Sequence, residues 1–142
     1  MVAYSFQKRF AGAVEDGSKP HTIRADRKRH AMVGERLQLY CGMRTKNCFK
    51  IIEDPICQRV HDISIVVGER RFVAIFVRRP LCLHGIERVE IEPELFDQFA
   101  VSDGFRDAQD MHEFWQASHG AGIFRGKLIG WGRWPLDEVT LP

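Results

Sequence analysis

The chain has 142 residues, which is enough for one domain with a real hydrophobic core and too short for two. Hydrophobic residues make up 44% of it and charged residues 28%, the composition of an ordinary soluble globular protein. No apolar run approaches the ~20 residues of a transmembrane helix, and the first residues lack the apolar segment of a signal peptide. We therefore expect a cytoplasmic protein without membrane contact.

The first third of the chain combines short elements with a conspicuous turn. Alternating side chains predict a strand at residues 4–10, and residues 11–16 are expected to form a helical turn that Gly17 ends. Pro20 excludes a helix interior at the residues that follow. If Thr22 and Arg24 lie on an extended segment, they point to the same face, because side chains alternate along a strand.

The middle of the chain is rich in β-strand patterns. Residues 27–32 resemble a solvated loop, and residues 42–47 an exposed basic hairpin tip. Strands are predicted at residues 36–41, 48–54, 59–67, 71–77 and 86–91. Turn signals at short, regular spacing favour a small barrel over a parallel sheet.

Two helices and a final strand follow. Pro93 is suited to the first position of a helix that continues over residues 94–101. A second helix is predicted at residues 106–118, ended by Gly120, and a strand at 123–131 returns to the barrel. We expect one α+β domain over residues 1–134, a small β-barrel with flanking helices, and a peripheral tail at 135–142.

The segment Gly17-Ser18-Lys19-Pro20-His21-Thr22-Ile23-Arg24 holds the candidate site. A threonine hydroxyl becomes a usable nucleophile when a neighbouring base takes its proton. Lys19 can act as that base if its pKa falls, which partial burial and the nearby cations Arg24 and His21 favour. Asp103 is the candidate proton carrier for a leaving amine.

These residues resemble the hallmark of the ASCH domain, a branch of the PUA-like superfamily. The hallmark here is Gly17-x-Lys19-x-x-Thr22-Ile23-Arg24, and three further blocks follow in the family's order, at residues 33–40, 100–105 and 111–115. The resemblance is loose between residues 51 and 94. It implies a PUA-like barrel with flanking helices.

The resemblance also implies two functions. Some ASCH proteins are amidohydrolases of N(4)-acetylcytidine with a lysine, a threonine and a glutamate as the catalytic set. Lys19 and Thr22 match two of these, Asp103 stands for the glutamate with one methylene fewer, and Arg24 matches the hallmark arginine as a substrate-orienting or structural cation. PUA-like domains also commonly bind RNA, which makes a binding module the leading expectation and the hydrolase the alternative.

The charge distribution supports the binding module. Residues 1–50 carry 11 Lys and Arg against 4 Asp and Glu, whereas residues 51–142 carry 10 against 15. A basic first third favours a surface for RNA or single-stranded DNA, unless these cations pair with the acidic remainder. The candidate phosphate contacts are Lys8, Arg9, Arg27, Lys28, Arg29, Arg44 and Lys46.

Aromatic and imidazole groups complete the predicted site. Tyr40, His30 or Trp131 can stack an unpaired base, as RNA readers require. His21 and Tyr40 are also candidates for contacting a substrate, although a solvated role is the simpler interpretation of His21 and His30. Trp115 and Trp134 are expected to pack in the core or at its edge.

Simpler roles also fit the four hallmark positions. Lys19 can be a solvated turn lysine, Thr22 a strand residue and Asp103 a helix-capping or turn aspartate. Arg24 and Asp103 can form a structural ion pair.

The cysteines give no metal pattern. Cys41, Cys48, Cys57 and Cys82 are not spaced as Cys-x-x-Cys pairs, so reduced thiols are expected. His112-Glu113 lacks the second histidine of the zinc-protease motif. We expect no metal and no cofactor, and the sequence leaves the oligomeric state open.

Overall fold

The computed structural model describes residues 1–81 and 85–133 and, among these, the side chains outside residues 79–87. The strands are β1 (Val2–Phe6), β2 (His21–Ala25), β3 (Leu37–Cys41), β4 (Phe49–Lys50), β5 (Arg59–Val67), β6 (Phe72–Leu81), β7 (Gly85–Glu90) and β8 (Gly122–Gly130). The helices are α1 (Lys8–Asp16), α2 (Phe96–Ser102) and α3 (Ala108–His119), and a 3-10 turn η1 (Pro93–Leu95) precedes α2. The fold is mixed α+β, as predicted.

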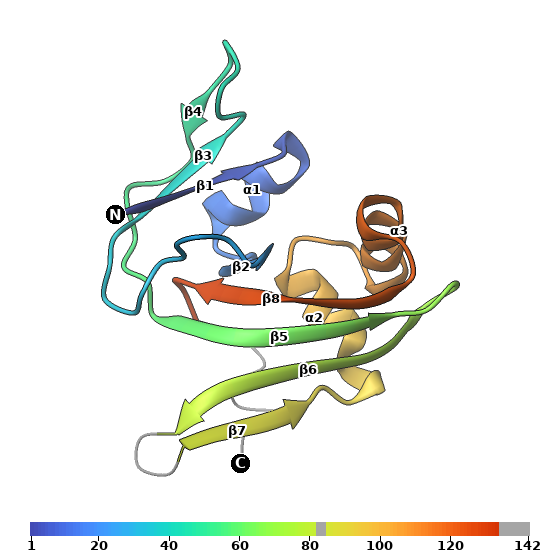
Figure 1. Ribbon diagram of the computed structural model, residues 1–142. Coiled ribbons are helices and arrows are strands. Elements are labelled where there is room, and N and C mark those ends of the chain that lie inside the picture. Colours follow the sequence, from blue (N-terminus) through green and yellow to red (C-terminus); the bar gives the residue numbers. More distant parts are fainter. Residues whose placement is uncertain (82–84, 134–142) are drawn as a thin grey trace.

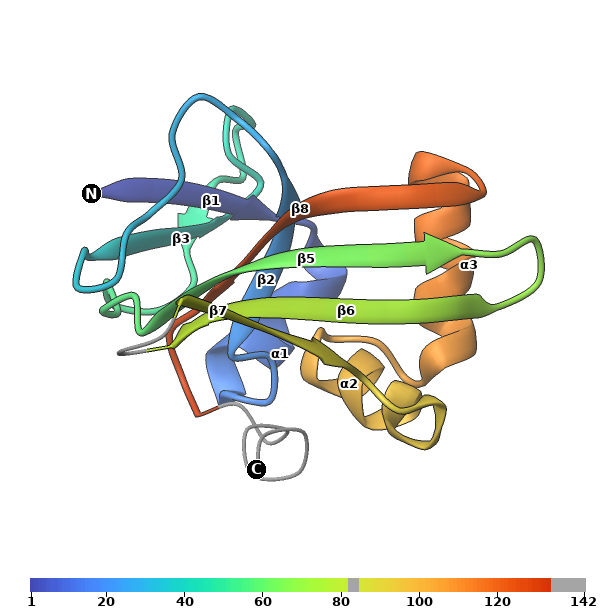
Figure 2. The ribbon, with the colours of Figure 1, turned by 60° about the horizontal axis from the view of Figure 1, so that its bottom comes forward.

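The strands form two sheets (Figure 1). The larger sheet has the order β2-β8-β5-β6-β7 with antiparallel pairing throughout, and the smaller has the order β1-β3-β4. In the smaller sheet β1 and β3 are parallel, which the long connection through α1 and β2 permits. Figures 1 and 2 show α2 and α3 against one face of the larger sheet.

The core lies between the larger sheet, the helices and the strands β1 and β3 of the smaller sheet. In β5 the buried residues Ile63, Ile65 and Val67 alternate with half-buried ones, as expected for a strand with one face in a core. Phe99 and Met111 bring α2 and α3 into the same cluster, and both are fully buried. Each of these two helices therefore turns one face toward the core.

The predicted barrel is not closed in the described part of the chain. β2 is an edge strand of the larger sheet and is hydrogen-bonded there to β8, while β1 and β3 pair with each other in the smaller sheet. Local alternation in the sequence predicts where strands lie, but it does not predict how the strands pair.

The predicted first strand was too long. It ends at Phe6, and Lys8–Asp16 form α1, in which Phe10 and Val14 bury one helical face. An i, i+4 apolar pair fits a helix better than a strand, and it overrides the alternation seen over residues 4–10. Gly17 ends the helix in the left-handed conformation with φ 86°, as predicted.

None of the helices in the described residues is long and apolar enough to cross a membrane. Of the described cysteines, Cys41 and Cys57 are buried and Cys48 is exposed, all as free thiols. The predicted tail at 135–142 and the residues Trp134 and Cys82 lie outside the described part.

Candidate functional site

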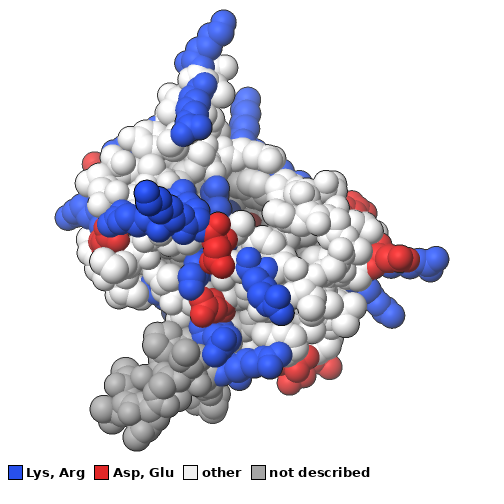
Figure 3. All heavy atoms as spheres, in the orientation of Figure 1, with Lys and Arg blue, Asp and Glu red and all other residues white. Residues whose placement is uncertain are grey.

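A pocket of about 280 Å³ opens beside the edge strand β2. Its walls come from the end of β1 and the start of α1 on one side, β2 at the base, and α3 with the start of β8 on the other. Figure 3 shows a hollow between these two parts of the surface. Lys19, Thr22, Arg24 and Asp103 all line this pocket.

Lys19 reaches the pocket from the turn after α1. Its backbone N–H donates to the carbonyl of Ala13 at 2.9 Å, which fixes the turn against the helix. The ammonium is buried and donates to Asp103 twice, to the carboxylate Oδ1 at 2.9 Å and to the main-chain carbonyl at 2.6 Å. The alternative of a solvated turn lysine is therefore wrong.

Gly104 makes room for this contact. It has φ +95°, and a Cβ there would lie 2.9 Å from the Cδ of Lys19 and 2.9 Å from the ring of Phe10. Both the backbone conformation and the space require glycine. Asp103 and Gly104 thus act together. The aspartate binds the Lys19 ammonium, and the glycine leaves room for the aliphatic part of the lysine side chain.

Asp103 stands at the end of α2 and is buried. Its Oδ1 lies 2.9 Å from the Lys19 Nζ and 3.2 Å from the His21 Nε2. Burial alone raises the pKa of Asp103, but Lys19 and His21 outweigh it and hold that pKa below its usual range. The shorter acid therefore reaches the lysine without the extra methylene of a glutamate.

Burial has the opposite effect on the pKa values of the two neighbouring bases, Lys19 and His21. Burial lowers the pKa of Lys19, against the pull of the Asp103 carboxylate, and it lowers the pKa of His21 for the same reason. His21 is fully buried and stacks on Phe99 with ring centroids 5.9 Å apart. The solvated interpretation of His21 is wrong: it stands behind Asp103 rather than at the pocket surface.

Thr22 and Arg24 share one face of β2, as predicted. The Arg24 Nε donates to the Thr22 Oγ1 at 2.9 Å, and a terminal nitrogen of Arg24 donates to the Ser5 carbonyl at 2.6 Å. The guanidinium also lies over the Phe6 ring, 5.0 Å from its centroid. Because Arg24 occupies an acceptor site of the hydroxyl, the hydroxyl proton is available to a base or a ligand.

Five side chains form an aromatic wall of the pocket, which the sequence interpretation missed as a site feature. Phe10, Phe105 and Phe114 pack on one another with ring centroids 5.2 to 5.6 Å apart, and Trp115 packs edge-on against Phe124 at 4.5 Å. All five line the pocket. Trp115 was expected in the core or at its edge, because an apolar helical face does not reveal where a core has an opening.

The cations near α1 and β2 have structural contacts. The Arg9 guanidinium donates to Asp110 of α3 at 2.8 Å and stands over the Phe10 and Phe105 rings, 5.0 Å from each centroid, so it joins α1 to α3. Arg27 lies over the Tyr4 ring at 4.6 Å, and Arg29 donates to Glu35 at 2.5 Å. The alternative that basic residues of the first third pair with acidic residues of the rest of the chain is thus confirmed for Arg9.

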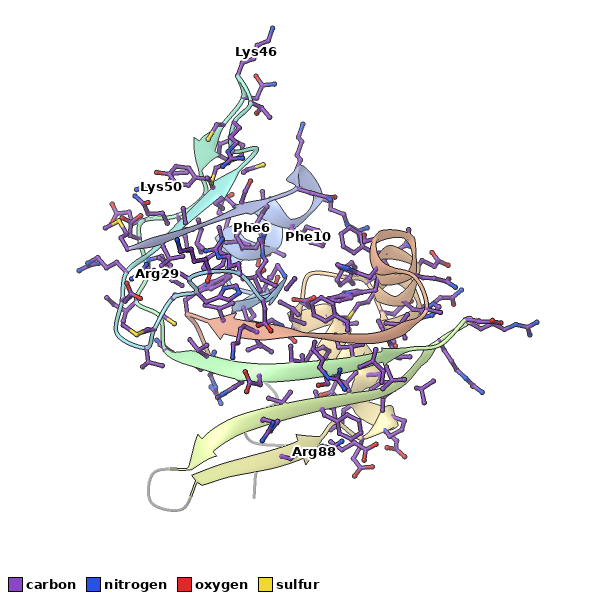
Figure 4. The ribbon with its side chains drawn as sticks, in the orientation of Figure 1. Phe6, Phe10, Arg29, Lys46, Lys50 and Arg88 are labelled. Atoms are coloured by element: carbon purple, nitrogen blue, oxygen red, sulfur yellow. The ribbon has the colours of Figure 1, made fainter. Side chains whose placement is uncertain are left out.

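Other predicted phosphate contacts are exposed. Within the described residues, Lys8, Lys28, Arg44 and Lys46 have no ion-pair partner. Figure 4 shows Lys46 at the tip of the β3–β4 hairpin, far from Phe6 and Phe10 at the pocket.

The predicted stacking groups lie elsewhere. Tyr40 is half-buried on β3, with the Lys50 ammonium 5.7 Å from its ring centroid. His30 stacks on Tyr4 with ring centroids 6.0 Å apart, and Trp131 is only 7% exposed. None of these three rings is among the residues that line the pocket.

No group of three or more His, Cys, Asp and Glu side chains in the described residues is arranged to hold a metal ion. Comparisons with protein-family models, with curated proteins and with solved structures found no match. The arguments for function therefore come from the pocket itself.

Proposed function

We propose that this chain is a PUA-like ASCH domain that binds RNA or single-stranded DNA and takes one unstacked base into the pocket beside β2. The observation that carries the proposal is that polar and aromatic side chains line one pocket. Lys19, Thr22, Arg24 and Asp103 form the polar part of the lining, and Phe10, Phe105 and Phe114 belong to the aromatic wall beside it.

A nucleobase suits such a pocket because it has an apolar face and a polar edge. Base-to-aromatic stacking supplies affinity, and hydrogen bonds to the base edge supply selectivity. The volume of about 280 Å³ is near the lower end of the range for small-molecule sites. A single base or nucleoside is the polynucleotide component of that size.

The loop after β2 provides a route for the phosphates. Ala25 lines the pocket, and the cations Arg27, Lys28 and Arg29 follow directly in the chain. Cations beside a base pocket bind the backbone without reading sequence.

The binding test uses the half-buried Phe114. We expect Phe114→Leu to weaken binding of a fluorescent single-stranded RNA 12-mer about fivefold or more, because stacking contributes ~1–3 kcal/mol per base. Phe49→Leu is the matched control, since Phe49 is 50% exposed on β4 and does not line the pocket. Equal affinities of Phe114→Leu and wild type would exclude this pocket as the base site.

A second candidate function is hydrolysis of N(4)-acetylcytidine or a similar acylated nucleoside. It is favoured by the shared pocket of Lys19, Thr22 and Asp103 and by the buried Lys19–Asp103 contact. In this reaction the Thr22 oxygen attacks the acetyl carbon and its proton passes to Lys19 in the neutral form. The carbon–nitrogen bond then breaks, and the cytidine amine takes the proton that Lys19 accepted, with Asp103 as the carrier. Water then hydrolyses the acetyl-threonine, which releases acetate and restores the hydroxyl.

Product release distinguishes the two functions. For a hydrolase, wild type releases cytidine and acetate, Lys19→Ala and Thr22→Ala each abolish release, and the double variant is no worse than either. Because Asp103 already reaches Lys19 at 2.9 Å, Asp103→Glu is expected to crowd the site and slow turnover. No acetate release by folded wild type, beside an active control enzyme, would leave the binding function alone.

A further inference from the structure

The outer face of the larger sheet carries a row of charged residues that begins at the pocket. The strand register places Arg24 opposite Lys127, Lys127 opposite Asp62, Asp62 opposite Arg78 and Arg78 opposite Arg88. Residues directly opposite in antiparallel strands share a face. One row therefore crosses all five strands, from the pocket wall on β2 to the edge strand β7.

Most of this row is basic and reachable. Arg78 and Arg88 are exposed, and Lys127 is half-buried beside Asp62, with which it forms an ion pair. Arg125, two residues before Lys127 on β8, adds a further exposed cation on the same face. Figure 3 shows Lys and Arg side chains over this part of the surface.

An aromatic ring lies in the neighbouring row. Phe76 is opposite Ser64 on β5 and opposite the exposed carboxylate Glu90 on β7, and Ser64 is opposite Arg125. The Arg88 guanidinium stands 4.1 Å from the Phe76 ring centroid. Figure 4 shows Arg88 on β7, at the far side of the sheet from Phe6 and Phe10. Arg88 is thus held flat on the sheet with its outward side open to solvent.

We propose that Lys127, Arg125, Arg78 and Arg88 form a basic track for the phosphate backbone of the same single-stranded nucleic acid whose base enters the pocket. Adjacent strands are about 4.8 Å apart, so the row from β2 to β7 is about 19 Å long. Its cations outnumber its carboxylates, and it continues directly from Arg24 in the pocket. The inference rests on the proposed binding function and extends it from one base to a longer segment.

The track predicts that affinity depends on oligonucleotide length. A trinucleotide occupies the pocket and at most the near part of the track, whereas a 12-mer reaches across it. The probes are a uridine 12-mer and a uridine trimer, labelled with fluorescein and measured by anisotropy between 0.05 and 0.5 M salt, roughly the range over which counterion release is resolved.

The test variant carries Arg78→Gln, Arg88→Gln and Arg125→Gln together. Each lost phosphate contact on a single strand lowers the salt slope by ~0.7, so three contacts lower it by about 2 and affinity at about 0.1 M salt by up to about a hundredfold. Trimer binding is expected to stay within about twofold, since the pocket is intact. The matched control replaces three exposed arginines outside the track, Arg36, Arg70 and Arg106, with Gln.

The outcomes separate the track from the pocket. A track variant that binds the 12-mer with the affinity and salt slope of wild type overturns the track, and if Phe114→Leu still weakens binding, the base pocket stands. An equal loss of 12-mer affinity in the control variant also overturns the track, because the change in net charge alone then explains the effect. Wild type that binds neither probe refutes both proposals, and stronger displacement by polyglutamate than by unlabelled 12-mer assigns the track to an acidic protein segment.

Discussion

The buried pair between Lys19 and Asp103 gives a prediction about stability. Asp103→Asn keeps the shape of the side chain and removes its charge, which leaves the ammonium without its counter-ion. Both side chains are at most 5% exposed. Removing one partner of a buried ion pair costs ~3–5 kcal/mol.

The structure places the effect at the lower end of that range. The main-chain carbonyl of Asp103 still accepts a hydrogen bond from Lys19 in the variant. We therefore expect the free energy of unfolding to fall by about 3 kcal/mol. For a domain of this size such a loss lowers the Tm by about 10 °C.

Urea unfolding followed by tryptophan fluorescence measures the change, and Lys19→Met, alone and combined with Asp103→Asn, completes a double-mutant cycle. The double variant is expected to be more stable than Asp103→Asn alone, because it no longer buries an unpaired charge. A loss below about 1 kcal/mol in Asp103→Asn would show that the pair is not buried as described and would refute the reasoning.

The same carboxylate gives a pH dependence with a definite sign. The pKa of Asp103 is lower in the folded protein than its ordinary value of 3.8, through Lys19 and His21. Its contribution to stability is therefore complete above the unfolded pKa and is lost as the pH falls through the folded one. Wild type should lose stability in that acidic range, and Asp103→Asn should lose less.

Three further outcomes are expected from the site. Gly104→Ala should lower the Tm and distort the pocket, because its Cβ would come within 2.9 Å of Lys19 and Phe10; unchanged nucleoside affinity and Tm would contradict this. Arg9→Met should destabilise the contact between α1 and α3 while leaving the salt slope of RNA binding intact, since Arg9 is paired with Asp110; calorimetry and anisotropy check the two halves. Changing the three cations of residues 27–29 to Ala should weaken RNA binding for every sequence and flatten the salt slope, and salt-independent binding by wild type would argue against a polyanion site.

The strand predictions had uneven success: residues 48–54 were predicted as a strand, and only Phe49–Lys50 of them form β4. Residues 59–67 were predicted as a strand and form β5 with the same bounds, because alternation and β-branched residues determine a half-buried strand locally. The first strand was predicted four residues too long, because Lys8, Arg9 and Phe10 fit both an alternating and a helical pattern. The pairing into two sheets depends on contacts between distant segments, which no local pattern contains.

In the candidate site, too, local features were predictable from the sequence and contacts between distant segments were not. A turn motif was enough to place Lys19, Thr22 and Arg24 together, since all three lie within six residues on one turn and one strand. Asp103 is 84 residues from Lys19, and only the family resemblance of residues 100–105 suggested it. The burial of His21 and the aromatic wall were not predictable, because both depend on how α2 and α3 pack on the sheet.

The position of β8 in the larger sheet has a consequence for biosynthesis. β8 is the last strand of the described chain, yet it lies between β2 and β5 and pairs with both. While the ribosome is still making residues 122–130, β2 and β5 each expose an unpaired edge. Such edges can pair with strands of other chains, so a nascent chain stalled before residue 122 is expected to aggregate. The synthesis of residues 122–130 ends this exposure, because β8 then pairs with both strands.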